Sequence, residues 1–158
     1  MVVEVNNYDY TEMKVGIVSS CGGHLTEVRT LKPVYERYEN FYVLNDSVHL
    51  PQDMYEKTYF IRHSERDWLF FVNLWEAWKI LRNERPLVIL STGAGPVVPF
   101  AIVGRLLGIK TVFIETFTRV TRPSLTGRIM YRLADRFFYQ WKSLEPCFPK
   151  GIYGGPLV

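Results

Sequence analysis

The alternation of short apolar runs with segments of helical periodicity constrains the fold of this chain most. Leu87–Leu90 (LVIL) is apolar at every position, which is typical of a strand whose sheet is covered on both faces. This run ends on the turn Ser91–Pro96, and an apolar segment with helical periodicity extends from Val97 to about Leu107. Strands that alternate with helices predict an α/β fold, a Rossmann-like parallel sheet with helices on both faces.

The same alternation divides the rest of the chain. Residues 1–13 carry no pattern and are predicted to be an N-terminal arm, and residues 14–158 are predicted to be a single domain. The predicted strands are Val15–Ser19, Phe41–Leu44, Lys57–Ile61, Leu87–Leu90, Thr111–Glu115 and Phe137–Trp141. The predicted helices are Leu25 to Tyr38 (kinked or split at Pro33), Glu65 to Asn83, Val97 to Leu107 and Leu125 to Arg136.

Composition bounds the compartment and the class of protein. The 158 residues are 47% hydrophobic, which is enough to bury a core and too much for a disordered chain. Two cysteines, Cys21 and Cys147, make no disulfide framework and favour a reducing compartment. We expect neither a membrane-spanning helix nor a secretory signal, because no apolar run is long enough and no basic start precedes one.

The charge of the chain is unevenly distributed. The net charge is +3, but residues 105–158 hold nine Lys or Arg against three Asp or Glu. On a helix, Arg128, Arg132 and Arg136 would form one cationic face, which is either solvated or in contact with anionic lipid headgroups. Nucleic acid is not expected as a partner, because this face has no aromatic stacking platform and no known binding motif.

Two glycine-rich turns follow predicted strands and precede predicted helices. Gly22 and Gly23 follow the first strand, and Gly93, Ala94 and Gly95 follow the strand Leu87–Leu90. Glycines let the backbone approach a ligand closely, and the start of a helix favours phosphate. The alternative is a pair of tight turns with glycine for steric reasons alone. Because ligands of parallel sheets bind at the carboxyl ends of the strands, we expect both turns to face one crevice.

His24 and Glu115 are the candidate catalytic residues of this crevice. A neutral imidazole at the start of a helix can accept a proton from an attacking hydroxyl, but His24 can equally be a capping residue. Glu115 can bind substrate, or it can be a buried carboxylate paired with an arginine or with backbone N–H groups. Cys21 is disfavoured as a nucleophile, because no arginine stands six positions after it. The histidines show no ligand spacing, so no metal site is expected.

The predicted helix Glu65 to Asn83 has more apolar residues than one core-facing stripe requires. Trp68, Trp75 and Trp78 are part of this excess. The sheet, a partner protein or a lipid interface could each cover them, and tryptophan is favoured at lipid interfaces. With Arg128 and Arg132, they are the candidates for membrane or partner contact.

Three segments resemble the Alg14/PssD family, over residues 14–158 in all. They are Ser20–His24 (SCGGH), the long segment from Ser91 to Trp141, and the closing Ile152–Val158 (IYGGPLV). That family supplies the N-terminal half of a GT-B glycosyltransferase divided between two polypeptides, and it is similar to the acceptor domain of MurG. The resemblance implies that this chain has the fold of such a half.

The resemblance also implies roles for individual residues. The predicted loops would hold the diphosphate and sugar of a lipid-linked acceptor, and either His24 or Glu115 would be the base. The residues expected to bind the acceptor or its phosphates are Gly22, Gly23, Gly93, Ala94, Gly95, Thr116 and Arg122. No cofactor and no metal are implied.

The function implied is that of an acceptor-binding and membrane-docking subunit. A catalytic partner subunit would bind a UDP-sugar, and the sugar would pass to a polyprenyl-diphosphate-linked saccharide. The chain alone would be inactive, because the partner subunit holds the nucleotide-sugar site. It would be cytoplasmic and peripheral at the inner face of the plasma membrane, because the N-terminal anchor of the eukaryotic members is not found in it. The alternatives are a stand-alone α/β enzyme that acts on a phosphorylated small molecule, and a non-catalytic scaffold for membrane recruitment.

Overall fold

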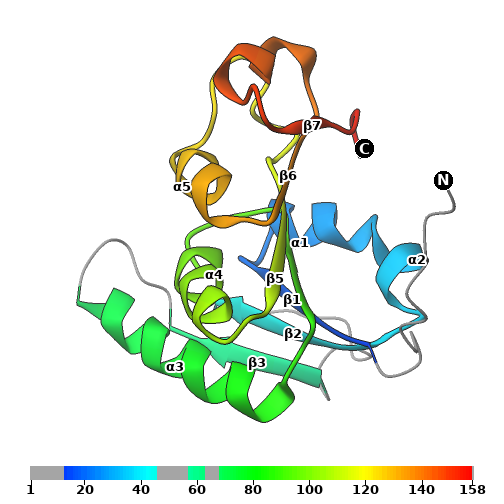
Figure 1. The fold of residues 1–158 in the computed structure, drawn as a ribbon. Helices are drawn as coiled ribbons and strands as arrows, with labels where there is room; N and C mark the ends of the chain where they lie inside the picture. Colours follow the sequence, from blue (N-terminus) through cyan, green and yellow to red (C-terminus); the bar gives the residue numbers. More distant parts are fainter. Residues whose placement is uncertain (1–12, 46–56, 63–67, 158) are drawn as a thin grey trace, which may run out of the picture.

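A computed structural model describes residues 13–45, 57–62 and 68–157. They form one seven-stranded sheet in the order β3-β2-β1-β4-β5-β6-β7 (Figure 1). The strands are β1 (Lys14–Ser19), β2 (Glu39–Asn45), β3 (Thr58–Ile61), β4 (Val88–Ser91), β5 (Lys110–Ile114), β6 (Arg136–Tyr139) and β7 (Ile152–Tyr153). The α-helices are α1 (Gly23–Arg29), α2 (Lys32–Tyr35), α3 (Leu69–Glu84), α4 (Val97–Leu106) and α5 (Leu125–Leu133), and a 3₁₀ helix, η3, spans Lys142–Cys147. The predicted arm lies outside the described residues, apart from its last residue.

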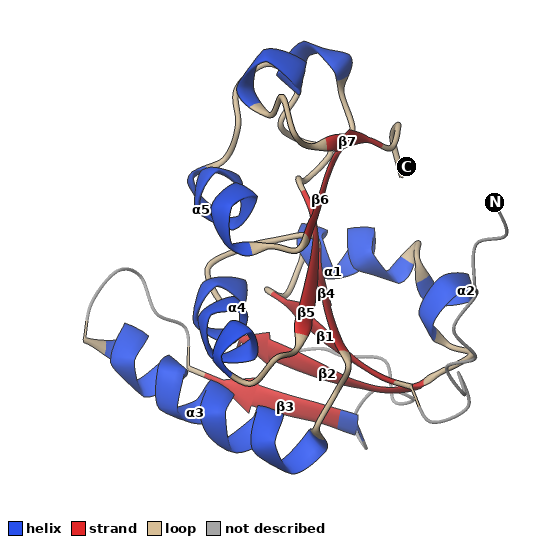
Figure 2. Cartoon of the chain, viewed as in Figure 1, coloured by secondary structure: helices blue, strands red, loops and turns tan. Residues whose placement is uncertain are grey.

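Helices cover both faces of the sheet. Helices α1 and α2 lie on one face, and α3, α4 and α5 lie on the other (Figure 2). Each face has its own apolar cluster, in which strand side chains meet those helices. Ile17 of β1 belongs to the cluster on the α1 and α2 face, and its neighbour Val18 belongs to the cluster on the α3, α4 and α5 face, since successive strand residues point to opposite faces. This arrangement confirms the fold class predicted from the apolar runs.

One helix boundary differs from the predictions. The segment around Pro33 is split into two helices, one of the two predicted outcomes, and Pro33 lies in the first turn of α2, where a missing N–H costs no helical hydrogen bond. The start predicted for α3, Glu65, lies outside the described residues. The prediction that the last helix reaches Arg136 is wrong, because the extended backbone of Ala134 ends α5 and Arg136 opens β6. The cationic face of α5 is therefore limited to Arg128 and Arg132.

The strand order determines where a ligand site can form. All six pairs of neighbouring strands are parallel, so the carboxyl ends of β1 to β7 lie at one edge. The chain order reverses between β1 and β4, whose neighbours lie on opposite sides. Crevices form at such reversal points in open α/β sheets. The two glycine-rich loops leave the sheet at this point.

Candidate functional site

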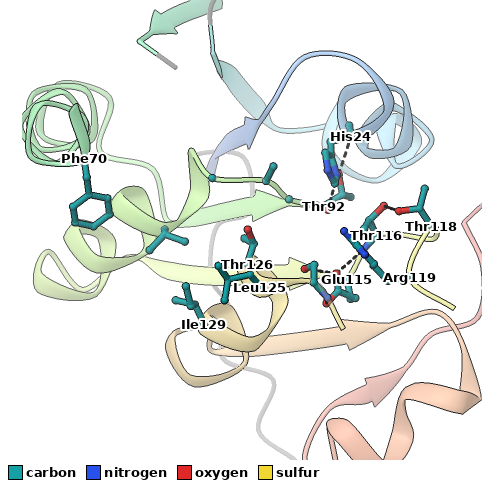
Figure 3. Close-up of a pocket in the computed structure, with 15 residues that line it drawn as sticks. His24, Phe70, Thr92, Glu115, Thr116, Thr118, Arg119, Leu125, Thr126 and Ile129 are labelled. Carbon is teal, nitrogen blue, oxygen red and sulfur yellow. Dashed lines mark hydrogen bonds between the residues drawn. The ribbon is translucent and has the colours of Figure 1, made fainter. Parts of the chain in front are cut away.

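A cavity of about 660 Å³ opens at the carboxyl edge of the sheet. Its walls come from the start of α1, from the loops after β4 and β5, and from α3, α4 and α5 on the other face (Figure 3). The lining residues are His24, Phe70, Thr92, Gly93, Ala94, Gly95, Val98, Glu115, Thr116, Thr118, Arg119, Ser124, Leu125, Thr126 and Ile129. The structure therefore places both predicted catalytic residues and the second glycine loop in one cavity.

His24 is held by two hydrogen bonds to Thr92 in the loop after β4. Its Nδ1 atom lies 3.1 Å from the carbonyl oxygen of Thr92, and the Thr92 hydroxyl donates to the carbonyl oxygen of His24 at 2.9 Å. A carbonyl oxygen can only accept, so Nδ1 carries the proton in this contact. In the neutral ring Nε2 then keeps its lone pair, so it can act as a proton acceptor in the cavity.

Gly93 packs directly against the His24 ring. Its backbone has a φ of +122°, a conformation that residues with a Cβ rarely adopt. A Cβ at this position would lie 2.9 Å from Cε1 of His24. Glycine is therefore required here both by the backbone and by contact with the imidazole.

Glu115 is buried at the carboxyl end of β5, where both carboxylate oxygens accept hydrogen bonds. Oε1 accepts from the Ser124 hydroxyl at 2.8 Å and from the Thr116 N–H at 3.2 Å, and Oε2 accepts from the Ser124 N–H at 3.2 Å. The Ser124 hydroxyl also caps α5 by accepting from the Gly127 N–H at 2.8 Å. A Cβ on Gly127 would lie 1.7 Å from Oε2 of Glu115, so this glycine leaves room for the carboxylate.

The environment of Glu115 shifts the pKa of its carboxyl group. Burial raises the pKa of the carboxyl above its ordinary value, and the hydrogen bonds from Ser124 and Thr116 offset only part of the rise. Glu115 is thus the buried carboxylate paired with backbone N–H groups that the sequence allowed. It also lines the cavity, and its role in substrate binding stays a prediction.

Glu115→Gln is expected to flatten the pH dependence of stability. A raised folded-state pKa means that Glu115 stabilises the fold below the ordinary carboxyl pKa, and that this contribution is lost as pH rises through the folded-state value. Urea unfolding of both proteins between about pH 4 and pH 8 measures the difference in unfolding free energy. As pH rises, the unfolding free energy of the wild type should fall relative to that of Glu115→Gln. A constant difference across the range would contradict the raised pKa.

The cavity has two chemically different ends. His24, Thr116 and Arg119 lie at one end, whereas Phe70 and Ile129 lie toward the other (Figure 3). Helices α3, α4 and α5 build the apolar end with four side chains, those of Phe70, Val98, Leu125 and Ile129. Sequence reasoning did not place these four residues in the site, and it assigned no ligand-binding role to Thr118, Arg119 or Ser124. The aromatic excess of α3 was the available signal for Phe70.

Three of the predicted phosphate ligands lie outside the cavity lining. Gly22 and Gly23 are exposed at the start of α1, one or two residues before His24. Arg122 is also exposed and does not line the cavity, whereas Arg119 does. The polar loop after β5 therefore turns Arg119 toward Glu115, and that arginine stabilises the ionised carboxylate.

The predicted contact surface is only partly exposed. Trp68, Phe71 and Trp75 are 67%, 71% and 65% exposed on α3, and their spacing places them along one side of the helix. Trp78 instead packs against the core, with the Arg82 guanidinium 5.7 Å from its ring centre.

In the part of the chain that the structure describes, no group of three His, Cys, Asp or Glu side chains is arranged to hold a metal ion. None of the described helices is both long and apolar enough to span a bilayer.

The sequence model of the Alg14-like oligosaccharide biosynthesis proteins matches residues 64–157, more than half of the chain. The chain belongs to this family. A human member, named UDP-N-acetylglucosamine transferase subunit ALG14, is 27% identical over 180 residues, which cover 92% of this chain and 83% of the human one. The rat protein of that name is 32% identical over 108 residues, which cover 61% of this chain and 50% of the rat one. These matches confirm the family that the sequence segments indicated.

Solved structures share the fold at low sequence identity. MurG from Acinetobacter baumannii has a TM-score of 0.68 and 13% identity, and the match covers 81% of this chain and 41% of MurG. UDP-N-acetylglucosamine 2-epimerase from Rickettsia bellii has a TM-score of 0.72 and 11% identity, with 92% and 45% covered. This chain thus spans less than half the length of either protein. Its fold is that of one half of a GT-B type protein.

Proposed function

We propose that this chain is the acceptor-binding and membrane-docking subunit of a two-chain glycosyltransferase. The donor, a UDP-sugar, binds to a partner subunit, and the acceptor is a polyprenyl-diphosphate-linked saccharide. One finding supports a division between two chains. The curated relatives are named as subunits of a UDP-N-acetylglucosamine transferase.

The two-ended cavity is the observation that carries the proposal. A lipid-linked saccharide has a hydrocarbon chain, an anionic diphosphate and a polar sugar in sequence. The apolar end of the cavity suits the hydrocarbon next to the diphosphate, and the Arg119 guanidinium at the polar end suits the phosphate charge. Thr116 and Thr118 add hydroxyl groups that can bind sugar or phosphate oxygens. A water-soluble phosphorylated substrate would leave the apolar end without a function.

His24 is the base of the proposed reaction. An oxygen of the acceptor sugar forms a bond to C1 of the donor sugar, and the bond from C1 to the UDP oxygen breaks. The hydroxyl proton passes to Nε2 of His24, while the Thr92 carbonyl holds the Nδ1 proton and stabilises the imidazolium. Glu115 is less suited to this step, because both of its oxygens already accept hydrogen bonds from the protein.

Reconstitution with a donor-binding subunit tests the proposal. Transfer from a UDP-sugar to a polyprenyl-diphosphate-linked saccharide is expected only when both chains are present, because one half of a GT-B fold offers one half of the site. Radiolabelled donor and extraction of the lipid product measure the rate. Turnover of a phosphorylated small molecule by this chain alone would overturn the proposal in favour of a stand-alone enzyme. Full transfer by the partner alone, bound to vesicles, would favour a recruitment scaffold.

The membrane contact is proposed to combine the exposed aromatic side of α3 with the arginines of α5. Both helices lie on the same face of the sheet (Figure 1). Trp68, Phe71 and Trp75 would enter the lipid interface, and Arg128 and Arg132, which are exposed, would face anionic headgroups.

Arg128→Ala with Arg132→Ala is expected to weaken binding of this chain to vesicles that contain phosphatidylglycerol. Each arginine near such a surface contributes about 1 kcal/mol, so the partition coefficient should fall at least about tenfold. Vesicle flotation measures it. The matched control is Arg29→Ala with Arg37→Ala, which removes the same charge from the α1 and α2 side of the sheet. Equal losses of vesicle binding in both double variants would mean that only the net charge of the chain matters, and would contradict the proposed contact surface.

A further inference from the structure

Gln140 lies at the carboxyl end of β6 and is almost fully buried, at 1% exposed. Its Nε2 atom donates to Oε1 of Glu27 on α1 and to the carbonyl oxygen of Glu115 at 3.0 Å. Its Oε1 atom accepts from the Leu157 N–H at 2.8 Å. One amide group therefore joins α1, the end of β5 and the C-terminal segment.

Glu27 extends this connection to the loop after β5. It is also 1% exposed, and its Oε1 atom accepts from the Phe117 N–H at 2.8 Å. His24 is one turn before Glu27 on the same helix, and Phe117 stands between Thr116 and Thr118, which line the cavity. The Glu27–Gln140 pair thus lies between the wall that carries His24 and the wall that carries Glu115.

Neither residue of this pair lines the cavity, and the pair is not arranged for stability alone. The second carboxylate oxygen of Glu27 is buried without a hydrogen-bond partner, which is costly for an ionised group. A buried carboxylate that holds two donors from different elements instead fits a role in orienting those elements.

We propose that Glu27 and Gln140 are positioning residues that hold the two walls of the cavity at their working separation. The hydrogen bond from the Leu157 N–H to Gln140 also couples this separation to the position of the C-terminal segment. The catalytic consequence rests on the proposed function, whereas the coupling itself is a property of this chain.

An exchange of the two side chains tests the pair. Gln140→Glu places a second carboxylate against Glu27, so kcat of the reconstituted pair should fall about tenfold or more, with the donor KM within about twofold. Adding Glu27→Gln restores a donor facing a carboxylate, and should recover at least half of the loss on a logarithmic scale. Hydrogen exchange at the Phe117 amide should follow the same order, faster in Gln140→Glu and slower again in the double variant. A double variant no better than Gln140→Glu, in rate and in exchange, would overturn the proposal.

Leu157→Pro tests the coupling to the C-terminal segment. Proline removes the N–H that donates to Oε1 of Gln140, whereas the control Leu157→Ala keeps this N–H and loses only side-chain packing. Hydrogen exchange at the Phe117 amide should be faster in Leu157→Pro than in Leu157→Ala. This comparison does not depend on Gln140→Glu, so it still tests the coupling if that variant fails to fold. Equal exchange in the two variants would refute the coupling. If the wild-type pair transfers no sugar, the proposed function fails, and Phe117 exchange alone then decides whether the Glu27–Gln140 pair acts as proposed.

Discussion

Replacing His24 with Ala is expected to lower the single-turnover rate of sugar transfer by the reconstituted pair about 10²- to 10⁴-fold, the usual contribution of a general base. The reason is the position of the ring, whose Nδ1 proton is held by the Thr92 carbonyl so that Nε2 is left as the acceptor. Rapid-quench measurement with saturating donor and acceptor gives the rate of the chemical step.

His24→Asn separates catalysis from positioning. The Asn side-chain N–H₂ can replace Nδ1 as donor to the Thr92 carbonyl, but an amide is not a base at neutral pH. We expect this variant to keep wild-type stability and acceptor binding while its rate stays as low as that of the Ala variant. A rate near the wild-type value would remove His24 as the base and leave Glu115 as the candidate.

Gly93→Ala is expected to impair the site nearly as strongly, without removing any functional group. The backbone at φ +122° disfavours a Cβ, and that Cβ would lie 2.9 Å from the His24 ring. The ring must then move, and a displacement of about 1 Å in a reacting group costs about 10²-fold in rate. The measurement is the same single-turnover rate, taken per folded molecule.

Gly108→Ala is the matched control for Gly93→Ala. Its backbone also has a positive φ, +77°, but nothing lies within 4 Å of the Cβ that Ala would add. Both variants should lose about 1 to 2 kcal/mol of stability from the backbone alone, and only Gly93→Ala should lose transfer activity. Equal activity in the two variants would mean that contact between Gly93 and His24 has no part in catalysis.

The sequence was most informative where local chemistry and sheet geometry agree. The glycines after β4 and the residue Glu115 after β5 were predicted to share a crevice, because the carboxyl ends of parallel strands meet at one edge. This argument needs only the strand assignments, which the fully apolar runs make secure. The contact between Gly93 and His24 did not follow from it, since it depends on the backbone conformation of the loop.

The apolar end of the cavity could not be predicted in the same way. Phe70, Val98 and Ile129 come from three helices, and periodicity distinguishes a buried side chain from an exposed one without saying which space it lines. The same limit applies to Arg119 and Arg122, because the path of the polar loop decides which one turns inward.

The end of α5 shows how a tertiary contact overrides helical spacing. Arg128, Arg132 and Arg136 have the spacing of one helical face, yet Arg136 belongs to β6. The Asp135 carboxylate accepts from the Thr111 N–H at 2.9 Å and from the Lys110 ammonium at 2.9 Å, so it holds the chain beside β5 where the next strand begins. The partners of Asp135 are about 25 residues earlier in sequence, which local patterns do not reveal.

The central claim is that the start of α1 and the loops after β4 and β5 bind a lipid-diphosphate acceptor in one cavity. Titration of the ¹⁵N-labelled chain with a short-chain prenyl diphosphate that carries one N-acetylglucosamine tests it most directly. We predict that amide shift changes will cluster at Gly93, Ala94 and Thr116 at the polar end and at Phe70 and Ile129 at the apolar end. Changes confined to other surfaces, with none at Gly93 or Thr116, would contradict the account.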